Sequence, residues 1–219
     1  MAAIVSFIGW HDCGKTSLAV DVVSHLKAMG YNVAVMKSSS ETNIECDNPG
    51  TDTYKHKKAG ADSVLLVAPD QIVLQSADTE NSLQTMVHRF FPDADIVIAE
   101  GFKKTRKISK IEIAKDVDHK LRKEVSGVIA VATNVEGVAG DYIFHLDESL
   151  ELAQFIEKRF ILKEGKGKEI VSLLVNGQKV VLKDFIQRSL AGTVHGYVNS
   201  LKVSEDIEDI ELTIKIKRM

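Results

Sequence analysis

A short apolar run that leads into a glycine-rich loop constrains the fold of this chain most strongly. Residues Ile4–Ile8 are mainly apolar, and they are followed directly by Gly9-Trp10-His11-Asp12-Cys13-Gly14-Lys15-Thr16-Ser17. Glycine, four residues and then Gly-Lys-Thr, placed between a strand and a helix, are typical of a phosphate-binding loop (P-loop). The glycines let the main chain approach a phosphate, and the N–H groups at the start of the following helix point at the anion.

The side chains of this loop predict a nucleotide with a magnesium ion. Lys15 is expected to reach the terminal phosphates, and Thr16 to offer its hydroxyl to Mg²⁺. Cys13, at the start of a helix, is either a small filler or a thiol of raised reactivity. Two residues outside the loop, Lys37 and Asn134, complete the predicted set. The predicted nucleotide-binding residues are Gly9, Trp10, His11, Asp12, Cys13, Gly14, Lys15, Thr16, Ser17, Lys37 and Asn134.

Composition limits the classes of protein to consider. A chain of 219 residues suits one domain, or one domain with a small appendage, and 44% hydrophobic and 27% charged residues are ordinary for a soluble globular protein. The net charge of −3 argues against a nucleic-acid partner, and no apolar run is long enough to span a membrane. Two cysteines do not make a disulfide framework, and no secretory signal precedes the first strand. We therefore expect a cytoplasmic protein with free thiols.

Strands and helices alternate along most of the chain. Apolar residues at helical spacing predict a helix over 18–29, and the run at 33–36 predicts the next strand, so the first two strands should be parallel. Continuous apolar runs at 96–99 and 128–132 are typical of strands covered on both faces. These patterns predict an α/β fold, a mostly parallel P-loop NTPase-type sheet with helices on both faces. The remaining predicted elements are helices over 51–59, 80–91 and 150–162 and strands over 63–68, 71–75, 108–114 and 142–144.

The pattern changes after a Gly-Lys-Gly-Lys stretch at 165–168, which we interpret as a hinge. Asn176-Gly177 between two apolar runs predicts a hairpin. A helix capped by Asp184 and an alternating strand at 210–216 complete a small C-terminal α+β appendage. A unit of this size is marginal alone, so we expect it to pack on the main domain or on another subunit. The predicted domains are a nucleotide-binding domain at 1–163 and the appendage at 168–219.

A carboxylate at the end of a buried strand is the second signal. Glu100 follows the apolar run at 96–99, and the carboxyl ends of strands form the edge at which α/β folds bind ligands. There it would hold Mg²⁺, directly or through water, or orient a water molecule. Asp47 could reach the same ion from the loop after the second strand, whereas Asp95 should lie at the opposite edge and be structural. The predicted catalytic residues are Lys15 and Glu100, and the predicted metal ligands are Thr16, Glu100 and Asp47.

Several other polar residues have more than one interpretation. Asp52 either caps the next helix or binds a ligand. Thr133-Asn134 either reads a purine base, through the amide of Asn134, or forms a plain turn. Lys37 ends the second strand and is a candidate for the ligand edge. A basic cluster after the strand at 96–99 is either a solvated face or an anion site, and its members are Lys103, Lys104, Arg106, Lys107 and Lys110.

Taken together, these motifs resemble the molybdopterin-guanine dinucleotide biosynthesis protein B (MobB) family. The Pro-Gly-x-Asp-x-Tyr and Glu-Gly-Phe-Lys runs are far more specific to that family than the P-loop, and the resemblance covers about residues 1–160. Two departures stand out: Ser38–Thr42 replaces a stretch that is often histidine-rich, and Asn134 stands where an aspartate that reads guanine would be expected. The matching stretches are Gly9–Thr16, Lys37, Asp47–Tyr54, Lys58–Ala61, Glu100–Lys103 and Lys110-Ile111.

The resemblance implies a nucleotide-binding α/β fold, GTP and Mg²⁺ as ligands, weak hydrolysis and a homodimer. Its implied role is to assist the molybdopterin guanylyltransferase that attaches GMP to molybdopterin, so molybdopterin or its nucleotide derivative would be a further partner. For the appendage it implies no chemistry. The choice between GTP and ATP stays open because of Asn134.

The first functional hypothesis is therefore a GTP-binding accessory protein of molybdenum cofactor maturation. Hydrolysis would be slow, because no arginine is well placed to supply transition-state charge. The alternatives are an ATP-dependent small-molecule kinase or ligase, with its acceptor at the basic cluster, and a non-enzymatic nucleotide-sensing adaptor. Strands 71–75 and 108–114, if they lie at sheet edges, would favour a homodimer with one shared groove for an anionic pterin nucleotide.

Overall fold

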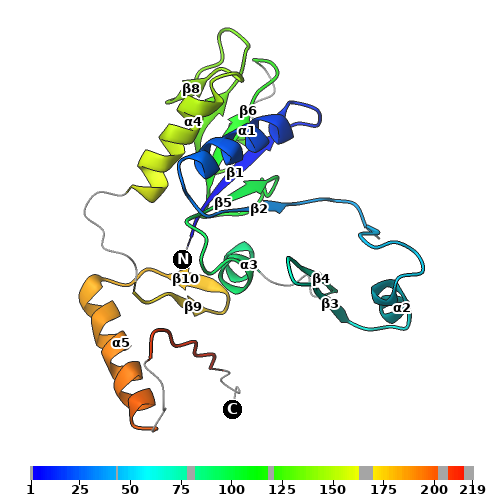
Figure 1. The fold of residues 1–219 in the computed structure, drawn as a ribbon. Coiled ribbons are helices and arrows are strands. Elements are labelled where there is room, and N and C mark those ends of the chain that lie inside the picture. Colours follow the sequence, from blue (N-terminus) through cyan, green and yellow to red (C-terminus); the bar gives the residue numbers. More distant parts are fainter. Residues whose placement is uncertain are drawn as a thin grey trace. The chain divides into compact units, whose positions relative to one another are not determined.

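A sheet of six strands, parallel at every ladder, forms the centre of the N-terminal part of the chain (Figure 1). The first strand of the chain lies near the middle of the sheet, with two strands on one side and three on the other. The loop that follows this strand therefore emerges from the middle of the sheet. This arrangement confirms the predicted α/β fold with a parallel sheet. In spatial order the strands are β2 (Val33–Lys37), β5 (Ile96–Glu100), β1 (Ala3–Gly9), β6 (Ser109–Ile113), β7 (Val128–Ala132) and β8 (Ile143–Phe144).

The chain divides into two compact units, Met1–Lys163 and Glu164–Met219. The predicted division into a nucleotide-binding domain at 1–163 and an appendage at 168–219 stays a prediction, and the hinge predicted at 165–168 lies outside the described residues. Within the described part of the chain, no helix has the length and apolar character needed to cross a membrane. The computed structural model describes residues 2–42, 44–77, 82–117, 121–162, 170–201 and 207–214.

Two helices pack together against one face of the sheet. α1 (Lys15–Ala28) buries Val22 and Leu26 completely, because its apolar residues recur every three or four positions and share one side of the helix. α4 (Ser149–Ile156) packs beside it and continues into one π-helical segment, Glu157–Ile161. Burial of one leucine-sized side chain stabilises the fold by roughly 1.5–3 kcal/mol. The strands contribute Val5, Phe7, Ile96, Ile98, Ile111, Ile113, Ala130 and Ala132 to this core.

β6 lies inside the sheet, between β1 and β7, so the expectation that this strand forms an edge is wrong. Its polar residues Lys110 and Glu112 are buried rather than solvated. Lys110 Nζ donates hydrogen bonds to the carbonyl oxygens of Thr105 and Ser126, at 2.6 and 2.7 Å, and burial lowers the pKa of Lys110 below its usual 10.5. Glu112 Oε1 accepts from the Leu121 N–H at 2.6 Å. The alternation of apolar and polar residues in this strand therefore does not mark a face that contacts solvent, because its polar side chains are buried and hydrogen-bonded in the interior.

The helix predicted after Pro49-Gly50 is α2 (Asp52–Lys58), and its cap differs from the expected one. Thr51 Oγ1 accepts a hydrogen bond from the Tyr54 N–H at 3.2 Å, so Thr51 is the N-cap. Asp52 is the first helical residue and forms an exposed ion pair with Lys55 at 3.1 Å. The interpretation of Asp52 as a cap is therefore wrong.

The strands predicted around Pro69-Asp70 form an antiparallel hairpin, β3 (Ser63–Val67) with β4 (Ile72–Ser76), which pairs outside the central sheet. Both faces of the hairpin are apolar, because successive residues of a strand point to opposite faces and the apolar run is continuous. Exposed apolar surface of this kind marks an interaction site. Its side chains, exposed by 37% to 68%, are Leu65, Leu66, Val67, Ile72, Val73 and Leu74.

The amino ends of the strands carry structural contacts. Asp95 Oδ2 accepts a hydrogen bond from the Asn32 N–H at 2.7 Å, at the edge opposite the P-loop, which confirms that Asp95 is structural.

α3 (Leu83–Phe90) is capped by Ser82, whose Oγ accepts from the Thr85 N–H at 3.1 Å. The start predicted for this helix, at residue 80, lies outside the described residues.

The second unit contains the predicted hairpin and helix: β9 (Leu173–Val175), β10 (Gln178–Val180) and α5 (Asp184–Asn199). Asn176 and Gly177 form its turn with positive φ angles of 51° and 73°. Two predictions are wrong. Lys183, not Asp184, occupies the N-cap position, and residues 210–214 of the strand predicted at 210–216 are not in a strand, the remainder lying outside the described residues.

Candidate functional site

The P-loop is a tight turn that only glycine permits at two positions. Gly14 has a φ of +87° and caps α1, and Leu18 N–H donates to its carbonyl oxygen at 3.1 Å. A Cβ at Gly9 would clash with Cys13 Sγ and would lie 2.8 Å from the carbonyl oxygen of Ile113. Cys13 is 4% exposed and packs into this space. Of its two interpretations, the structure therefore supports the small filler.

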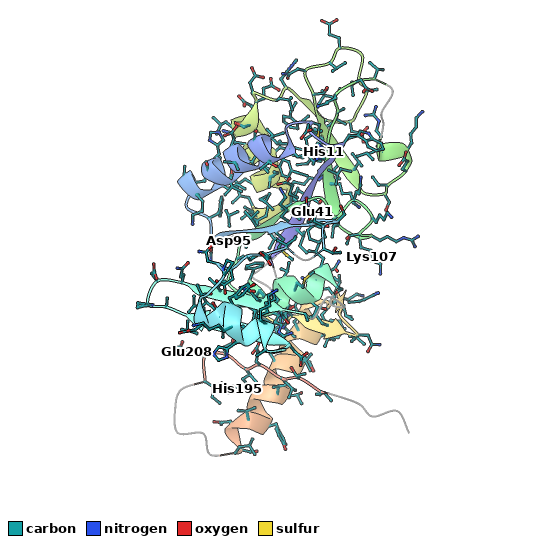
Figure 2. The ribbon with its side chains drawn as sticks, turned by 90° about the vertical axis from the view of Figure 1, so that its right-hand side faces the viewer. His11, Glu41, Asp95, Lys107, His195 and Glu208 are labelled. Atoms are coloured by element: carbon teal, nitrogen blue, oxygen red, sulfur yellow. The ribbon has the colours of Figure 1, made fainter. Side chains whose placement is uncertain are left out.

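Lys15 lies against its own loop. Its Nζ donates to the Trp10 carbonyl oxygen at 2.5 Å and lies 3.5 Å from Cys13 Sγ. These contacts hold the ammonium group at the beginning of the loop, beside the end of β1. His11 Nδ1 and Asp12 Oδ2 lie 2.7 Å apart, and both side chains are more than four-fifths exposed. Figure 2 shows His11 on this loop.

Three predicted residues meet at the carboxyl edge of the sheet. Thr16 Oγ1 donates a hydrogen bond to Glu100 Oε1 at 2.8 Å, and Lys37 Nζ lies 3.4 Å from the same oxygen. β2 and β5 pair Lys37 directly with Glu100, so the strand register sets this contact. The Glu100 side chain is 13% exposed and that of Lys37 is 64% exposed. The carboxylate is thus largely covered while its cationic partner reaches solvent.

The donor set at this edge fits a magnesium ion. Mg²⁺ prefers oxygen ligands, usually one or two from the protein together with water and substrate phosphates. Thr16 and Glu100 supply a hydroxyl and a carboxylate within hydrogen-bond distance of each other, next to the predicted phosphate-binding loop. In the described ranges no three His, Cys, Asp or Glu side chains converge. An ion held here would therefore depend on phosphate or water oxygens for its remaining ligands.

The loop after Glu100 is anchored beside the P-loop. Gly101 has a φ of +91°, its N–H donates to the Phe7 carbonyl oxygen at 3.0 Å, and its own carbonyl oxygen accepts from Ser6 Oγ at 2.6 Å. Phe102 follows with a φ of +51°, a conformation that non-glycine residues seldom adopt. The main chain turns sharply here and carries the next residue, Lys103, toward the P-loop.

Lys103 contacts the first side chain of the P-loop. Its Nζ lies 5.3 Å from the centroid of the Trp10 ring, within the range of a cation–π interaction. Sequence reasoning missed this pair, although Trp10 follows the first glycine of the loop and Lys103 follows the Glu100-Gly101 turn. Lys110 was predicted as a member of the basic cluster, and that prediction is wrong because its side chain is buried. The exposed members are Lys103, Lys104, Arg106 and Lys107, the last labelled in Figure 2.

Asp47 is engaged in the loop that leads into α2. Its carboxylate accepts hydrogen bonds from Thr53 Oγ1, from Thr51 Oγ1 at 2.9 Å and from the Asn48 N–H at 2.9 Å. The hydrogen bond from Thr53 is the largest cause that lowers the pKa of Asp47 below 3.8. Within the described residues Asp47 makes no hydrogen bond or ion pair with Thr16 or Glu100. The structure thus does not bring it to the other predicted metal ligands.

Asn134 holds two loops together at the end of β7. Its Oδ1 accepts a hydrogen bond from the Leu146 N–H at 2.8 Å. The neighbouring Thr133 is buried and donates to the carbonyl oxygen of Ala114 at 2.8 Å. These contacts support the interpretation as a turn, with the amide oxygen of Asn134 used by the protein itself. Base recognition by Asn134 stays a prediction.

The sequence of the chain is similar to those of known proteins. The family model described as "MobB: Molybdopterin guanine dinucleotide synthesis protein B" matches residues 4–134. The chain is 24% identical to a "putative molybdopterin-guanine dinucleotide biosynthesis adapter protein" of Methanocaldococcus jannaschii over 99% of both chains. It is 27% identical to the "molybdopterin-guanine dinucleotide biosynthesis adapter protein" of Escherichia coli, over 68% of this chain and 85% of that protein.

Two solved structures have similar folds. The crystal structure of "molybdopterin-guanine biosynthesis protein B (mobB)" aligns with a TM-score of 0.60 and 28% identity, covering 71% of this chain and 98% of the other. The structure of Bacillus subtilis MobB aligns with a TM-score of 0.59 and 20% identity, covering 75% of this chain and 99% of the other. The second likeness concerns the fold alone.

Proposed function

Since the chain belongs to the MobB family and is an adapter of molybdopterin guanine dinucleotide biosynthesis, we propose that it acts in that pathway by binding GTP together with Mg²⁺. The observation that carries the proposal is the 2.8 Å hydrogen bond between Glu100 and Thr16, the threonine that ends the Gly-Lys-Thr motif of the P-loop. A hydroxyl from the loop and a carboxylate from the neighbouring strand are the protein ligands that a magnesium-nucleotide site of this class uses.

The roles of the chain's residues follow from their positions. The N–H groups of the P-loop and of the α1 N-terminus bind the phosphates, and the Lys15 ammonium adds a positive charge at the terminal phosphate. Thr16 and Glu100 hold the magnesium ion, which neutralises charge on the phosphate oxygens. Lys37 accompanies Glu100 at the same edge and balances its charge when no metal is bound.

Hydrolysis of the nucleotide is proposed to be slow. Fast phosphoryl transfer in P-loop proteins uses an arginine that stabilises charge in the transition state. In the described residues Arg106 lies in the exposed loop after β5 and makes no hydrogen bond or ion pair with the P-loop. Lys15 is thus the cation that the loop itself provides. We propose that binding, rather than turnover, is the main activity.

Homodimer formation belongs to the same proposal. The β3–β4 hairpin exposes apolar side chains on both faces and pairs with no third strand among the described residues. Exposed apolar strands invite pairing with another chain. A second copy would cover this surface, and its loop at 101–107 would add basic residues to a shared groove. The proposed partners are molybdopterin or its nucleotide derivative and the guanylyltransferase of the pathway.

Isothermal titration calorimetry tests the proposal directly. The full-length protein is titrated with GTP and with ATP, each with Mg²⁺ and with EDTA. The proposal expects saturable binding of GTP that is stronger with Mg²⁺ and weaker binding of ATP. Equal or tighter binding of ATP, or turnover that begins only when a small-molecule acceptor is added, would contradict it.

A further inference from the structure

We propose that two copies of this chain pair their C-terminal segments, residues 208–218, as an antiparallel two-stranded ribbon centred on Thr213 of each copy. The inference rests on the homodimer of the proposed function. It adds to that dimer a contact in the second unit, to which the proposed function assigns no role. The partner of the segment is the same segment of a second copy, because its sequence is complementary to itself.

The open main chain of the segment is the first observation. Residues 207–214 belong to no helix or strand, and their main chain makes no hydrogen bond to another described residue. Leu212 and Ile214 are 64% and 72% exposed. Figure 1 draws 207–214 as coil, and Figure 2 labels Glu208. A stretch with open N–H and C=O groups and exposed apolar side chains is a template for pairing with another chain.

The second unit buries little apolar surface of its own. Among the described residues, no buried apolar side chain lies after Ile156. The buried side chain of this unit is Gln187 on α5, whose Oε1 accepts from the Ile170 N–H and whose Nε2 donates to the Leu182 carbonyl oxygen, both at 3.1 Å. Its sheet has only two described strands, β9 and β10, and a sheet of that size is marginal in water. Contact with a second copy would supply the missing burial.

Pairing about Thr213 matches the apolar face of the segment with itself. In such an antiparallel pair, a residue that precedes position 213 lies opposite the residue that follows it by the same number of positions. Leu212 therefore meets the partner's Ile214, and Ile210 meets the partner's Ile216. Because side chains alternate across a strand, these four positions share one face. Apolar side chains directly opposite each other stabilise a strand pair.

The same register sets every charged residue of the segment opposite a residue of the other sign. The first half of the segment is acidic and the second half is basic, so antiparallel copies bring opposite charges together, which stabilises a strand pair. A shift by two residues would set Glu208 or Arg218 opposite an isoleucine. The charged pairs, each formed twice, are Glu211 with Lys215, Asp209 with Lys217 and Glu208 with Arg218.

The symmetry of the pair limits it to two copies. Each segment presents the same residues to the other, so the contact is isologous and closes as a dimer. A two-stranded ribbon is marginal alone. The C-terminal pair therefore adds to the contact at the β3–β4 hairpin and does not replace it.

Disulfide formation in the full-length protein tests the register. Cys46 is exposed and is first replaced by Ser, whereas the buried Cys13 stays. Thr213→Cys then places one thiol of each copy at the symmetry axis, and oxidised glutathione should give a disulfide-linked dimer on a non-reducing gel. The matched control is Glu211→Cys on the same face. It should link at least about tenfold more slowly, because its two copies lie roughly 13 Å apart along the strands, beyond the reach of a disulfide.

A mixture of two variants tests the direction of pairing. Glu211→Cys and Lys215→Cys should each link slowly alone. Mixed in equal amounts, they should link at least about fivefold faster, since position 211 of one copy lies opposite position 215 of the other. A mixture that links no faster than its components would overturn the antiparallel register.

A charge exchange tests the complementarity. In the Thr213→Cys protein, Glu211→Lys and Lys215→Glu should each slow linking by about threefold or more, because each sets like charges opposite each other twice. The two changes add charge of opposite sign near the thiol, so altered thiol reactivity would not slow both. The protein that carries both changes should recover the original rate. Failure to recover would contradict the proposed charge pairs.

The outcomes separate this inference from the function on which it rests. If Thr213→Cys and Glu211→Cys link equally fast, the copies collide at random and the ribbon is wrong. If the protein is a dimer by light scattering but Thr213→Cys does not link, the ribbon is wrong and the homodimer stands. A monomer that does not link would overturn both the ribbon and the dimer, and calorimetry with GTP reports on the nucleotide site separately.

Discussion

Thr16 Oγ1 and Glu100 Oε1, 84 residues apart in the sequence, lie 2.8 Å from each other. One residue opens α1 and the other ends β5, and β5 is the direct neighbour of β1 in the sheet. Because the strands are parallel, their carboxyl ends share one edge, and the loop after β1 reaches the end of β5. The contact therefore follows from the strand order rather than from any local sequence.

Glu100→Gln should separate nucleotide binding from its metal dependence. The amide oxygen of Gln can still accept the Thr16 hydrogen bond, so the fold should change little. Loss of the negative charge should weaken Mg²⁺ binding by about tenfold or more and slow any hydrolysis. Calorimetry with Mg²⁺ in the presence of GTP measures the first effect, and Glu151→Gln on the exposed side of α4 serves as the control. Wild-type metal affinity in Glu100→Gln would make Glu100 purely structural.

Lys15→Ala should abolish binding of magnesium-nucleotide and leave the protein folded. The variant loses a charge-assisted contact to phosphate, together with two contacts inside its own loop, those to Trp10 and Cys13. Circular dichroism checks the fold and calorimetry the affinity. Lys158→Ala removes an exposed lysine of the π-helical segment as a matched control. An unchanged affinity in a folded Lys15→Ala protein would show that this loop is not the phosphate site.

Lys110→Met should destabilise the protein, by about 1–3 kcal/mol, because the carbonyl oxygens of Thr105 and Ser126 lose their donor. Denaturant unfolding measures the change, and Lys104→Met, at an exposed position, should alter stability by less than about 0.5 kcal/mol. Equal stability of the two variants would contradict the structural role of Lys110.

The same variant has a predicted pH dependence. Burial lowers the pKa of Lys110 in the folded protein below 10.5, so between that lowered value and 10.5 the unfolded chain binds more protons than the folded one. Stability contributed by Lys110 should therefore rise as pH increases through this window. The difference in unfolding free energy between wild type and Lys110→Met should grow accordingly.

A chain that ends at Leu162 should still bind nucleotide. The first unit contains the P-loop, Lys37 and Glu100, and the Escherichia coli relative matches 68% of this chain. Calorimetry with GTP and Mg²⁺ compares the shortened and full-length proteins. A soluble, folded product that fails to bind would show that the second unit contributes to the site.

The hairpin should control the oligomeric state. Light scattering at micromolar concentration should give the mass of a dimer, and the double variant Val67→Lys, Ile72→Lys should give a monomer. Both residues are more than 60% exposed in the single chain, so the change should not unfold it. Val181→Lys, at an 84% exposed residue of the second unit, is the control. A monomeric wild type, also with GTP and Mg²⁺ present, would exclude the dimer.

The sequence predicted the parts of the site that depend on local pattern and strand ends. Gly9 and Gly14 bracket the expected turn, and the strand that ends at Glu100 lies where its apolar run places it. The approach of Lys37 to Glu100 could be expected as well, because both residues end strands of one sheet. Their binding of nucleotide and metal stays a prediction.

Other features could not be read from the sequence, for physical reasons. A run of basic residues does not reveal that Lys110 turns inward, because that depends on the strands on either side of β6. The pair of Trp10 and Lys103 joins two loops whose distance is set by the sheet. The strand expected at 210–216 rested on alternation, but a strand also needs a partner for its main chain.

The two buried polar residues of β6 have a consequence for register. A slip of β6 by one residue would move Lys110 and Glu112 to the opposite face of the sheet, where apolar side chains pack against α1 and α4 and offer neither side chain its present hydrogen-bond partners. Because that slip would cost free energy, the buried pair favours the observed register of β1 and β6, in which Gly9 lies opposite Ile113. A lysine and a glutamate outside the predicted nucleotide site thereby favour the register that positions the start of the predicted phosphate-binding turn.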